Sequence, residues 1–421
     1  MNQHPRGRHL VAADRRFATG GGPVARLVAG GFHHMLDRID AGLACGGIDA
    51  TLPDGTHRLL GGRAPGPVPI VRLHSWRALV RLAASGSVGW YKAWALGEWS
   101  SPDPVPLFDL FMRNGETLGG VARAKGLWRG LNRVAHLLRG NSRSRARANI
   151  SFHYDLGNDF YAAWLDRSMT YSSALFAKPI APDEPLENAQ LRKVRRLLDR
   201  LDLRPGQRLL EIGCGWGALA EVAAREYGVE VVALTLSAEQ KAFAEARMVE
   251  AGLSERVSVR LTDYRDADER FDAVASVEMV EAVGQDYWPA YIQAIARALK
   301  PGGKAALQLI SIREELFDAY AASADFIQTY VFPGGMLISE RRFRAAAELA
   351  GLSWRDREGF GLHYAETLRR WRERYDIAVT EGRLDGFDPA FHDLWRYYLM
   401  YCEGGFRGGG IDVAQVTLAR A

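Results

Sequence analysis

The chain has 421 residues, of which 48% are apolar and 25% charged, and its formal net charge at pH 7 is +4. This composition is that of a globular protein and excludes a disordered or collagen-like chain. The length exceeds that of an average domain, so we expect more than one folded unit. No run of 18 apolar residues and no signal-peptide core is present, so we expect no membrane-spanning segment.

Three cysteines lie far apart in the sequence, at Cys45, Cys214 and Cys402. They form no C-x-x-C pattern of the kind that indicates a zinc site, and their spacing suggests no disulfide framework. We therefore expect a reducing, cytoplasmic setting and no bound metal.

The first 120 residues are expected to comprise a flexible N-terminus over 1–22 and a small mixed domain over 23–120. The Asp54-Gly55 pair favours a tight turn between two strand-like runs. A helix is expected over 76–85. Aromatic residues then gather over 88–99, either as a core or as a lipid contact.

A strongly basic segment lies in the linker that we expect over 121–148. Between Arg123 and Arg147 there are eight basic residues and no acidic one. Such a run is either a solvated helix face or a surface for anionic phospholipid headgroups, where each basic residue adds about 1 kcal/mol. The sequence has no recognisable nucleic-acid module, so we expect no nucleic-acid partner.

The stretch over 208–220 predicts a strand, a glycine turn and a helix. Gly213, Gly215 and Gly217 let the backbone approach a ligand closely, and the helix start presents free N–H groups. The spacing differs from the G-x-G-x-x-G pattern of dinucleotide-binding folds. Glu211 would repel a phosphate, so a ligand with a cationic or neutral centre fits better. S-adenosylmethionine is the candidate.

Strands and helices alternate around this turn, which indicates an α/β fold with a doubly wound, Rossmann-like sheet. The expected helices are 186–201, 238–251 and 287–299, and the expected strands are 229–236, 257–261, 271–277 and 304–310. The alternation breaks over about 311–365, where we expect an inserted helical cap. Its large apolar residues form either plain core or the wall of an apolar substrate pocket. These residues are Phe326, Tyr330, Phe332 and Met336.

Polar residues follow the strands at the edge where doubly wound sheets bind ligands. Thr235 and Gln240 stand where a nucleoside's ribose is expected, although an acidic residue is the commoner ribose partner. Asp263 and Tyr264 follow the next strand and are placed to contact an adenine.

Two carboxylates follow the fourth strand of this series. Glu278 and Glu281 are three residues apart, so on a helical turn both face in a similar direction. Either the pair is solvated or at least one member is functional, and its place at this edge favours function. Gln308 ends the next strand.

An ordered series of motifs carries a resemblance to a known family. The series comprises His153-Tyr154-Asp155-Leu156-Gly157-Asn158-Asp159, Tyr171-Ser172, the glycine turn, 235–240, 263–266, 278–284, 332–335 and 401–407. From residue 149 to the C-terminus, the chain resembles the cyclopropane-fatty-acyl-phospholipid synthases and the related mycolic acid methyltransferases. Residues 95–109 also resemble the small N-terminal domain of the synthases.

The resemblance implies a class I methyltransferase domain over 149–421, with S-adenosylmethionine as methyl donor. It implies that an alkene in an acyl chain of a membrane phospholipid attacks the methyl group, and that loss of a methyl proton then forms a cyclopropane ring. It also implies peripheral attachment to the inner face of the membrane, and it leaves a homodimer open. The implied cofactor-binding residues are Tyr171, Ser172, Gly213, Gly215, Gly217, Thr235, Gln240, Asp263 and Tyr264.

In the resembled family a bicarbonate ion is thought to act as the base. Its positions map to Ser173, Glu281, Gln308, Ile310 and Tyr364, which are therefore the implied catalytic residues. Ser173 replaces a cysteine and Gln308 replaces a histidine. Glutamine donates to an anion but does not carry a proton as histidine does, so bicarbonate and ring closure are both in question.

Three alternatives to a cyclopropane synthase stay open on the sequence. One is a fatty-acyl methyltransferase that gives methyl-branched unsaturated products without ring closure. Another is a methyltransferase of the same fold that acts on a soluble small molecule. The third is a non-catalytic lipid-binding protein that kept the fold.

Overall fold

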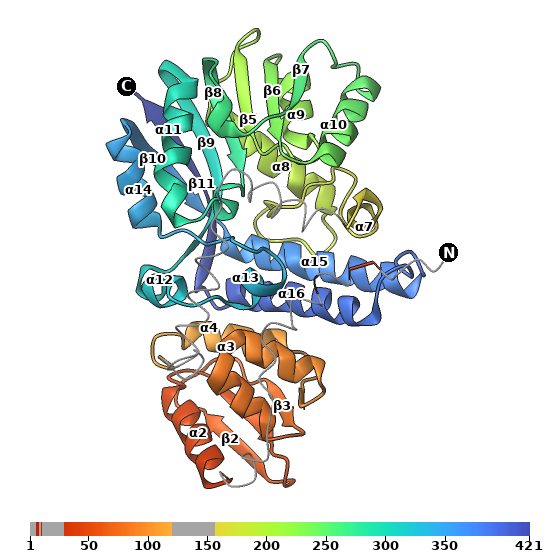
Figure 1. The fold of residues 1–421 in the computed structure, drawn as a ribbon, viewed down its shortest axis with the longest axis vertical. Coiled ribbons are helices and arrows are strands. Elements are labelled where there is room, and N and C mark those ends of the chain that lie inside the picture. The colour runs from red at the N-terminus through yellow and green to blue at the C-terminus, as the bar shows by residue number, and fades with distance from the viewer. Residues whose placement is uncertain (1–5, 8–9, 11–28, 120–155) are drawn as a thin grey trace. The chain divides into compact units, whose positions relative to one another are not determined.

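A computed structural model describes residues 6–7, 10, 29–119 and 156–421 of the protein (Figure 1). The chain divides into two compact units, each assembled from segments that are distant in the sequence. Unit 1 comprises 1–139, 315–333 and 385–411, and unit 2 comprises 140–314, 334–384 and 412–421. The basic linker expected over 121–148 lies outside the described residues.

Unit 1 is built on a four-stranded sheet in the order β2-β1-β3-β4. Its elements are α2 (Ala29–Gly42), β1 (Gly47–Thr51), β2 (His57–Gly61), β3 (Ile70–Leu73), α3 (Arg77–Ala95), β4 (Trp99–Ser100), α4 (Val105–Arg113), most of α12 (Glu314–Ala321), α13 (Phe326–Tyr330) and α16 (Pro389–Arg407). The predicted turn at Asp54-Gly55 joins β1 to β2, which pair antiparallel. The helix predicted over 76–85 is longer: the chain kinks at Gly86, where φ is 59° and ψ is −135°, and continues to Ala95. Glycine tolerates this backbone conformation.

An aromatic cluster forms part of the core of unit 1. The ring of Tyr91 lies 4.9 Å from that of Phe326, 4.8 Å from Tyr330 and 4.9 Å from Tyr397, measured between centroids. All four side chains are buried. The core interpretation of the aromatic residues over 88–99 is therefore confirmed for Tyr91. Because such rings bury large apolar areas, their packing holds 315–333 and α16 in the same unit as the N-terminal segments.

This division differs from the linear domain borders expected from the sequence. Residues 315–333 and 385–411 were expected in the methyltransferase domain, whereas they pack with unit 1. The described part of the N-terminal 22 residues also has defined contacts. The Arg6 N–H donates to the Gly386 carbonyl at 2.9 Å, and Leu10 is fully buried.

Unit 2 contains a seven-stranded sheet in the order β10-β11-β9-β8-β5-β6-β7. Its elements are α7 (Asn158–Ala162), α8 (Leu186–Asp199), β5 (Arg208–Ile212), α9 (Ala218–Glu226), β6 (Glu230–Thr235), α10 (Ala238–Glu250), β7 (Val257–Leu261), η3 (Tyr264–Asp266), β8 (Phe271–Val277), η4 (Val280–Ala282), η5 (Gln285–Tyr287), α11 (Trp288–Ala298), β9 (Leu299–Ile312), α14 (Glu340–Leu349), β10 (Leu352–Gly359), α15 (Gly361–Thr380) and β11 (Ile411–Arg420). The five strands from β9 to β7 are parallel, and β10 is antiparallel to β11.

The helices of unit 2 cover both faces of this sheet. The chain moves outward from β5 through β6 to β7 and then returns to β8 and β9 on the other side of β5. Right-handed crossovers in these two directions place α9 and α10 on one face and α11 on the opposite face (Figure 1). The predicted doubly wound fold is confirmed, and the predicted strands agree with β6 to β9 except at their ends.

The expectation of one helical cap over 311–365 is wrong for part of this segment. Residues 352–359 form β10, which pairs with β11 at the edge of the large sheet. This strand is rich in charged residues, as suits a half-solvated edge strand, and its sequence therefore lacks the apolar signal of a strand.

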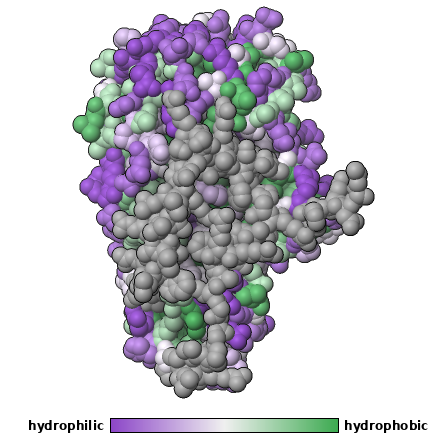
Figure 2. Space-filling model, viewed as in Figure 1, coloured by the Kyte–Doolittle hydropathy of each residue, from purple (hydrophilic) through white to green (hydrophobic). Residues whose placement is uncertain are grey.

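None of the described helices is long and apolar enough to cross a bilayer. Polar side chains cover most of the upper end of the face in Figure 2.

Candidate active site

A cavity of about 200 Å³ lies in unit 2 where β5, β6, β7 and β8 end. The strand order reverses between β5 and β8, and doubly wound sheets bind their ligands at this point. Eight of the nine predicted cofactor-binding residues line the cavity. They are Tyr171, Ser172, Gly213, Gly215, Thr235, Gln240, Asp263 and Tyr264.

Two glycines of the turn have different roles. Gly213 has a φ of 83°, and a Cβ there would lie 2.9 Å from Met279 Cγ, so glycine is required at this wall of the cavity. Gly217 does not line the cavity. A Cβ at Gly217 would lie 3.0 Å from the Cβ of Ala244, so this glycine instead allows α10 to pack closely against the turn.

Asn158, which belongs to the motif over His153–Asp159, contacts the glycine turn. The indole N–H of Trp216 donates to Asn158 Oδ1 at 2.8 Å, and Trp216 lines the cavity. This hydrogen bond connects the start of α7 with the turn after β5. Residues 153–155 of the motif lie outside the described part of the chain.

The residues predicted to hold the nucleoside are oriented by local hydrogen bonds. Thr235 Oγ1 donates to Gln240 Oε1 at 2.9 Å. Asp263 accepts from the Arg265 guanidinium at 2.8 Å and 2.6 Å. Arg265 also lines the cavity, a role that the sequence did not reveal.

Two buried charged residues line the same cavity. Lys193 Nζ donates to Ser172 Oγ at 2.7 Å, and burial lowers the pKa of Lys193 to about 8. Burial raises the pKa of Glu211 to about 8, and Glu211 Oε2 has no hydrogen-bond partner among the described residues. A buried carboxylate oxygen without a partner favours a ligand that brings positive charge. No motif indicated a role for Lys193, which lies on the buried face of α8.

Glu278 is the centre of a hydrogen-bond cluster at the cavity wall. Its Oε1 accepts from the Ser173 N–H at 2.9 Å and from Gln308 Nε2 at 2.8 Å. Its Oε2 accepts from the Tyr364 hydroxyl at 2.7 Å. Glu278 has a φ of 48°, a left-handed conformation that costs a non-glycine residue about 1 kcal/mol. The three hydrogen bonds hold the carboxylate in place despite this strain.

Glu281, the predicted catalytic carboxylate, lies beside this cluster. Its Oε1 accepts from the Ile310 N–H at 2.5 Å, and its Oε2 has no partner among the described residues. Burial and the charge of Glu278 raise the pKa of Glu281 to about 8. Burial also raises the pKa of Glu278, but its three donors oppose this effect. Because Glu281 has one such donor, the first negative charge of the pair resides on Glu278.

The five predicted catalytic residues thus come together around these two carboxylate groups. They are Ser173, Glu281, Gln308, Ile310 and Tyr364. None of the five is part of the cavity lining, whereas Glu278 is. The sequence identified Glu278 as one of two candidate carboxylates but did not place it in the catalytic set. Its spacing of three from Glu281 was the available signal.

The amide of Gln308 is fixed from its far side. Gln308 Oε1 accepts from Gln415 Nε2 at 3.1 Å, and Gln415 Nε2 also donates to the Lys193 carbonyl at 3.0 Å. This arrangement directs Gln308 Nε2 toward Glu278. Gln415 lies on β11, more than 100 residues along the chain, and no motif indicated its role.

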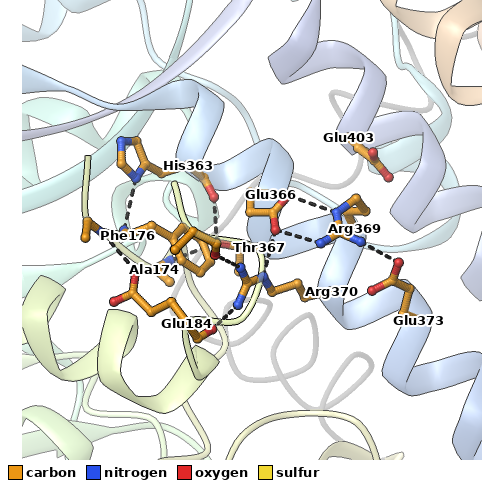
Figure 3. Close-up of polar contacts among 12 residues, drawn as sticks. Ala174, Phe176, Glu184, His363, Glu366, Thr367, Arg369, Arg370, Glu373 and Glu403 are labelled. Atoms are coloured by element: carbon orange, nitrogen blue, oxygen red, sulfur yellow. Dashed lines mark hydrogen bonds and ion pairs between the residues drawn. The ribbon is translucent and has the colours of Figure 1, made fainter. Parts of the chain in front are cut away.

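His363 and Thr367 on α15 bind the segment after Ser173 (Figure 3). Thr367 Oγ1 accepts from the Ala174 N–H at 3.1 Å, and His363 Nδ1 accepts from the Phe176 N–H at 3.0 Å. Because His363 and Thr367 flank Tyr364 on α15, these bonds set the positions of both donors around Glu278.

The comparisons with known proteins identify the family of the chain. Residues 141–416 match the model of a family described as mycolic acid cyclopropane synthetase. The chain belongs to this family. Its methyltransferase class and its class I fold, both expected from the motifs, are thereby shown.

Three relatives illustrate the similarity of this methyltransferase. It is 37% identical to tuberculostearic acid methyltransferase UfaA1 of Mycobacterium tuberculosis, over 95% of this chain and 93% of that protein. It is 34% identical to the cyclopropane-fatty-acyl-phospholipid synthase of Escherichia coli, over 81% of this chain and 85% of that protein. The structure of mycolic acid cyclopropane synthase CmaA1 with SAH and CTAB matches with a TM-score of 0.61 and 31% identity, over 65% of this chain and 98% of that one.

S-adenosylmethionine is the methyl donor of this methyltransferase family, and the residues at the cavity fit it. Its positive charge suits the unpaired Glu211 Oε2, and its methyl group is electrophilic because it is bonded to a sulfonium sulfur. Because Gly213 has no side chain, the ligand can lie close to the backbone at this turn. We propose that Thr235, Gln240, Asp263 and Tyr264 hold the nucleoside portion.

We expect Glu211→Gln to weaken S-adenosylmethionine binding about 10- to 100-fold, equivalent to about 1.4–2.8 kcal/mol, because the buried carboxylate attracts a cationic ligand. In the parent enzyme the affinity should increase between pH 6.5 and 8.5, since Glu211 with a pKa of about 8 ionises in this range. The variant should lose most of this increase. Isothermal titration calorimetry measures both effects. The control is replacement of the exposed Glu239 on α10 by glutamine. Equal affinities of the parent enzyme, Glu211→Gln and Glu239→Gln for S-adenosylmethionine would contradict the role of Glu211 in binding the cofactor.

Proposed function

We propose that this enzyme transfers a methyl group from S-adenosylmethionine to the double bond of unsaturated acyl chains in membrane phospholipids. The observation that carries the proposal is the Glu278 cluster at the wall of the cofactor cavity. Methylation of an alkene creates a carbocation, which is consumed when a proton leaves. The Glu278 carboxylate, held by Ser173, Gln308 and Tyr364, supplies a base at the wall of this cavity.

The proposed reaction follows from the groups at the cavity. The alkene π electrons form a bond to the methyl carbon while the carbon–sulfur bond breaks and its electron pair stays on sulfur. The positive charge then lies on the neighbouring chain carbon. The aromatic rings of Tyr171 and Trp216 line the cavity, and the faces of such rings stabilise a cation.

We propose a methyl-branched unsaturated product, which forms when the proton leaves a chain carbon. The match to the methyltransferase UfaA1 over 95% of the chain supports this product. Cyclopropane formation, which the family resemblance implied, is the second candidate. The 34% identity to the Escherichia coli synthase favours it.

We propose that the enzyme attaches peripherally to the inner face of the cytoplasmic membrane. In unit 1, Leu59 and Ile70 are 65% and 45% exposed. Both pair with Asp49 across neighbouring strands of the sheet, so they lie on one exposed face. The basic residues between Arg123 and Arg147 provide charge that attracts anionic headgroups.

The test of this function is release of S-adenosylhomocysteine by the purified enzyme with phospholipid vesicles. We expect release with vesicles of unsaturated acyl chains and none with otherwise identical saturated vesicles. Equal release with both vesicles would mean that the double bond is not the acceptor. Binding of S-adenosylmethionine without release would favour a non-catalytic lipid-binding protein.

We expect replacement of Arg143, Arg145 and Arg147 by serine to weaken vesicle binding about 10-fold or more at low salt. Three basic residues are removed, each worth about 1 kcal/mol near an anionic surface, and the difference should shrink as salt screens the charges. Sedimentation with anionic vesicles measures the effect, and neutral vesicles are the control. Unchanged sedimentation at low salt would remove the membrane role of this segment.

A further inference from the structure

The anion site expected for bicarbonate is filled by the protein itself. The predicted positions offer four donors, which are the N–H groups of Ser173 and Ile310, the Gln308 amide and the Tyr364 hydroxyl. Three of them donate to Glu278 and the fourth donates to Glu281. The second hydrogen of Gln308 Nε2 is directed to the Ser173 carbonyl at 3.3 Å. The four donors therefore already have carboxylate acceptors.

Bicarbonate does not fit this arrangement. A bound bicarbonate would have to displace the Glu278 carboxylate from three hydrogen bonds while remaining next to it. It would also place a second negative charge beside the carboxylate pair of Glu278 and Glu281, and like charges in a poorly solvated site repel strongly. The site therefore has the donors of an anion site but no vacancy for an external anion.

We propose that Glu278 is a built-in replacement for the bicarbonate ion and acts as the general base of the methyl transfer. This inference rests on the proposed function. Glu278 is suited to the role because its carboxylate joins the donor cluster to the cavity wall. Neither Glu281 nor Gln308 lines the cavity.

The proton transfer balances without any external co-reactant. After the new carbon–carbon bond forms, the Glu278 carboxylate takes a proton either from a chain carbon next to the carbocation or from the transferred methyl group. The electrons of that C–H bond form the double bond of the product, or the third side of a cyclopropane ring. Glu278 becomes a neutral carboxylic acid and returns its proton to water after product release.

The backbone at this position indicates a direct test. A φ of 48° is strained for glutamate but accessible to glycine. Glu278→Gly should therefore fold, and it leaves the donors of Ser173, Gln308 and Tyr364 without their carboxylate acceptor. The variant should thus gain a site for small carboxylate-like anions that the parent enzyme lacks.

Binding of ¹³C-labelled bicarbonate is the first measurement, made by NMR line broadening with the full-length protein and S-adenosylhomocysteine present. We expect no saturable binding by the parent enzyme or by the control Glu250→Gln on the exposed end of α10. We expect saturable binding by Glu278→Gly. Saturable binding by the parent enzyme, displaced by formate, would overturn the proposal.

Turnover with unsaturated vesicles is the second measurement. The parent rate should be the same in bicarbonate-free and bicarbonate-containing buffer. Glu278→Gln should lose about 100-fold or more. Glu278→Gly should be equally slow without bicarbonate and recover at least about 10-fold when bicarbonate or formate is added. A parent rate that falls when bicarbonate is removed, or full activity of Glu278→Gln, would contradict Glu278 as base.

These outcomes separate the two proposals. If the parent enzyme does not methylate unsaturated lipid in any buffer, the proposed function fails, while the bicarbonate-binding measurement still tests whether Glu278 fills the anion site. If the parent enzyme methylates lipid and requires bicarbonate, the function holds and the assignment of Glu278 fails.

Discussion

Replacing Glu281 by glutamine is expected to lower turnover about 100-fold or more while the affinity for S-adenosylmethionine changes by less than about threefold. Glu281 lies next to Glu278 and holds a proton at neutral pH, since its pKa is about 8. Glutamine keeps an acceptor for the Ile310 N–H but cannot exchange a proton with its neighbour. Steady-state kinetics and calorimetry with the cofactor measure the two quantities.

Thermal unfolding provides an independent check on the same variant. Burial raises the pKa of Glu281 from 4.5 in the unfolded chain to about 8 in the folded protein. The folded state therefore binds more protons between these values, and its stability falls as pH rises from about 4.5 to about 8. We expect Glu281→Gln to gain stability relative to the parent between pH 6 and pH 9. Loss of cofactor binding together with turnover would show that Glu281 acts in cofactor binding and not in the proton transfer.

Replacing Tyr364 by phenylalanine is expected to lower turnover at pH 7 about 10- to 100-fold. The Tyr364 hydroxyl donates to Glu278 Oε2 at 2.7 Å, and a hydrogen bond to a charged group contributes about 1.5–3 kcal/mol. Without it the pKa of Glu278 rises further, so less of this base is ionised at pH 7. The loss should shrink as pH increases, because Glu278 then ionises again.

The pH profile of kcat distinguishes this effect from general damage. We expect the ascending limb of the profile to move to higher pH in Tyr364→Phe. The matched control is Tyr227→Phe, which removes a hydroxyl that donates to Asp199 at 2.6 Å on the surface of unit 2. The control should retain the parent profile. A uniform loss at all pH values in Tyr364→Phe would contradict a role in the ionisation of Glu278.

The sequence predicted the parts of unit 2 that depend on short stretches of chain. The apolar run over 208–212 and the glycines after it define β5 and its turn, and the same local reasoning located β7 and β8. Eight of nine predicted cofactor residues line the cavity because strand ends meet at one edge of a parallel sheet. Gly217 was different because its constraint comes from α10.

Features that depend on contacts between distant segments could not be predicted from short stretches of the sequence. The aromatic packing of Tyr91 with Phe326 and Tyr397 joins segments more than 200 residues apart, and no local pattern reports it. The role of Glu278 also arises from three donors on separate segments. The motifs predicted that these donors belong to one site, but only the structure shows that they share Glu278 as acceptor.

Methyl transfer to lipid double bonds is best measured by lipid analysis of a host that lacks its own cyclopropane synthase. We expect expression of the enzyme to add one CH₂ unit to unsaturated acyl chains of phospholipids and to leave saturated chains unchanged. NMR of the isolated fatty acids should show a methyl branch beside a retained alkene, whereas cyclopropane protons would indicate the second candidate product. Unmodified acyl chains, with the enzyme present and folded, would contradict methyl transfer to the lipid double bond.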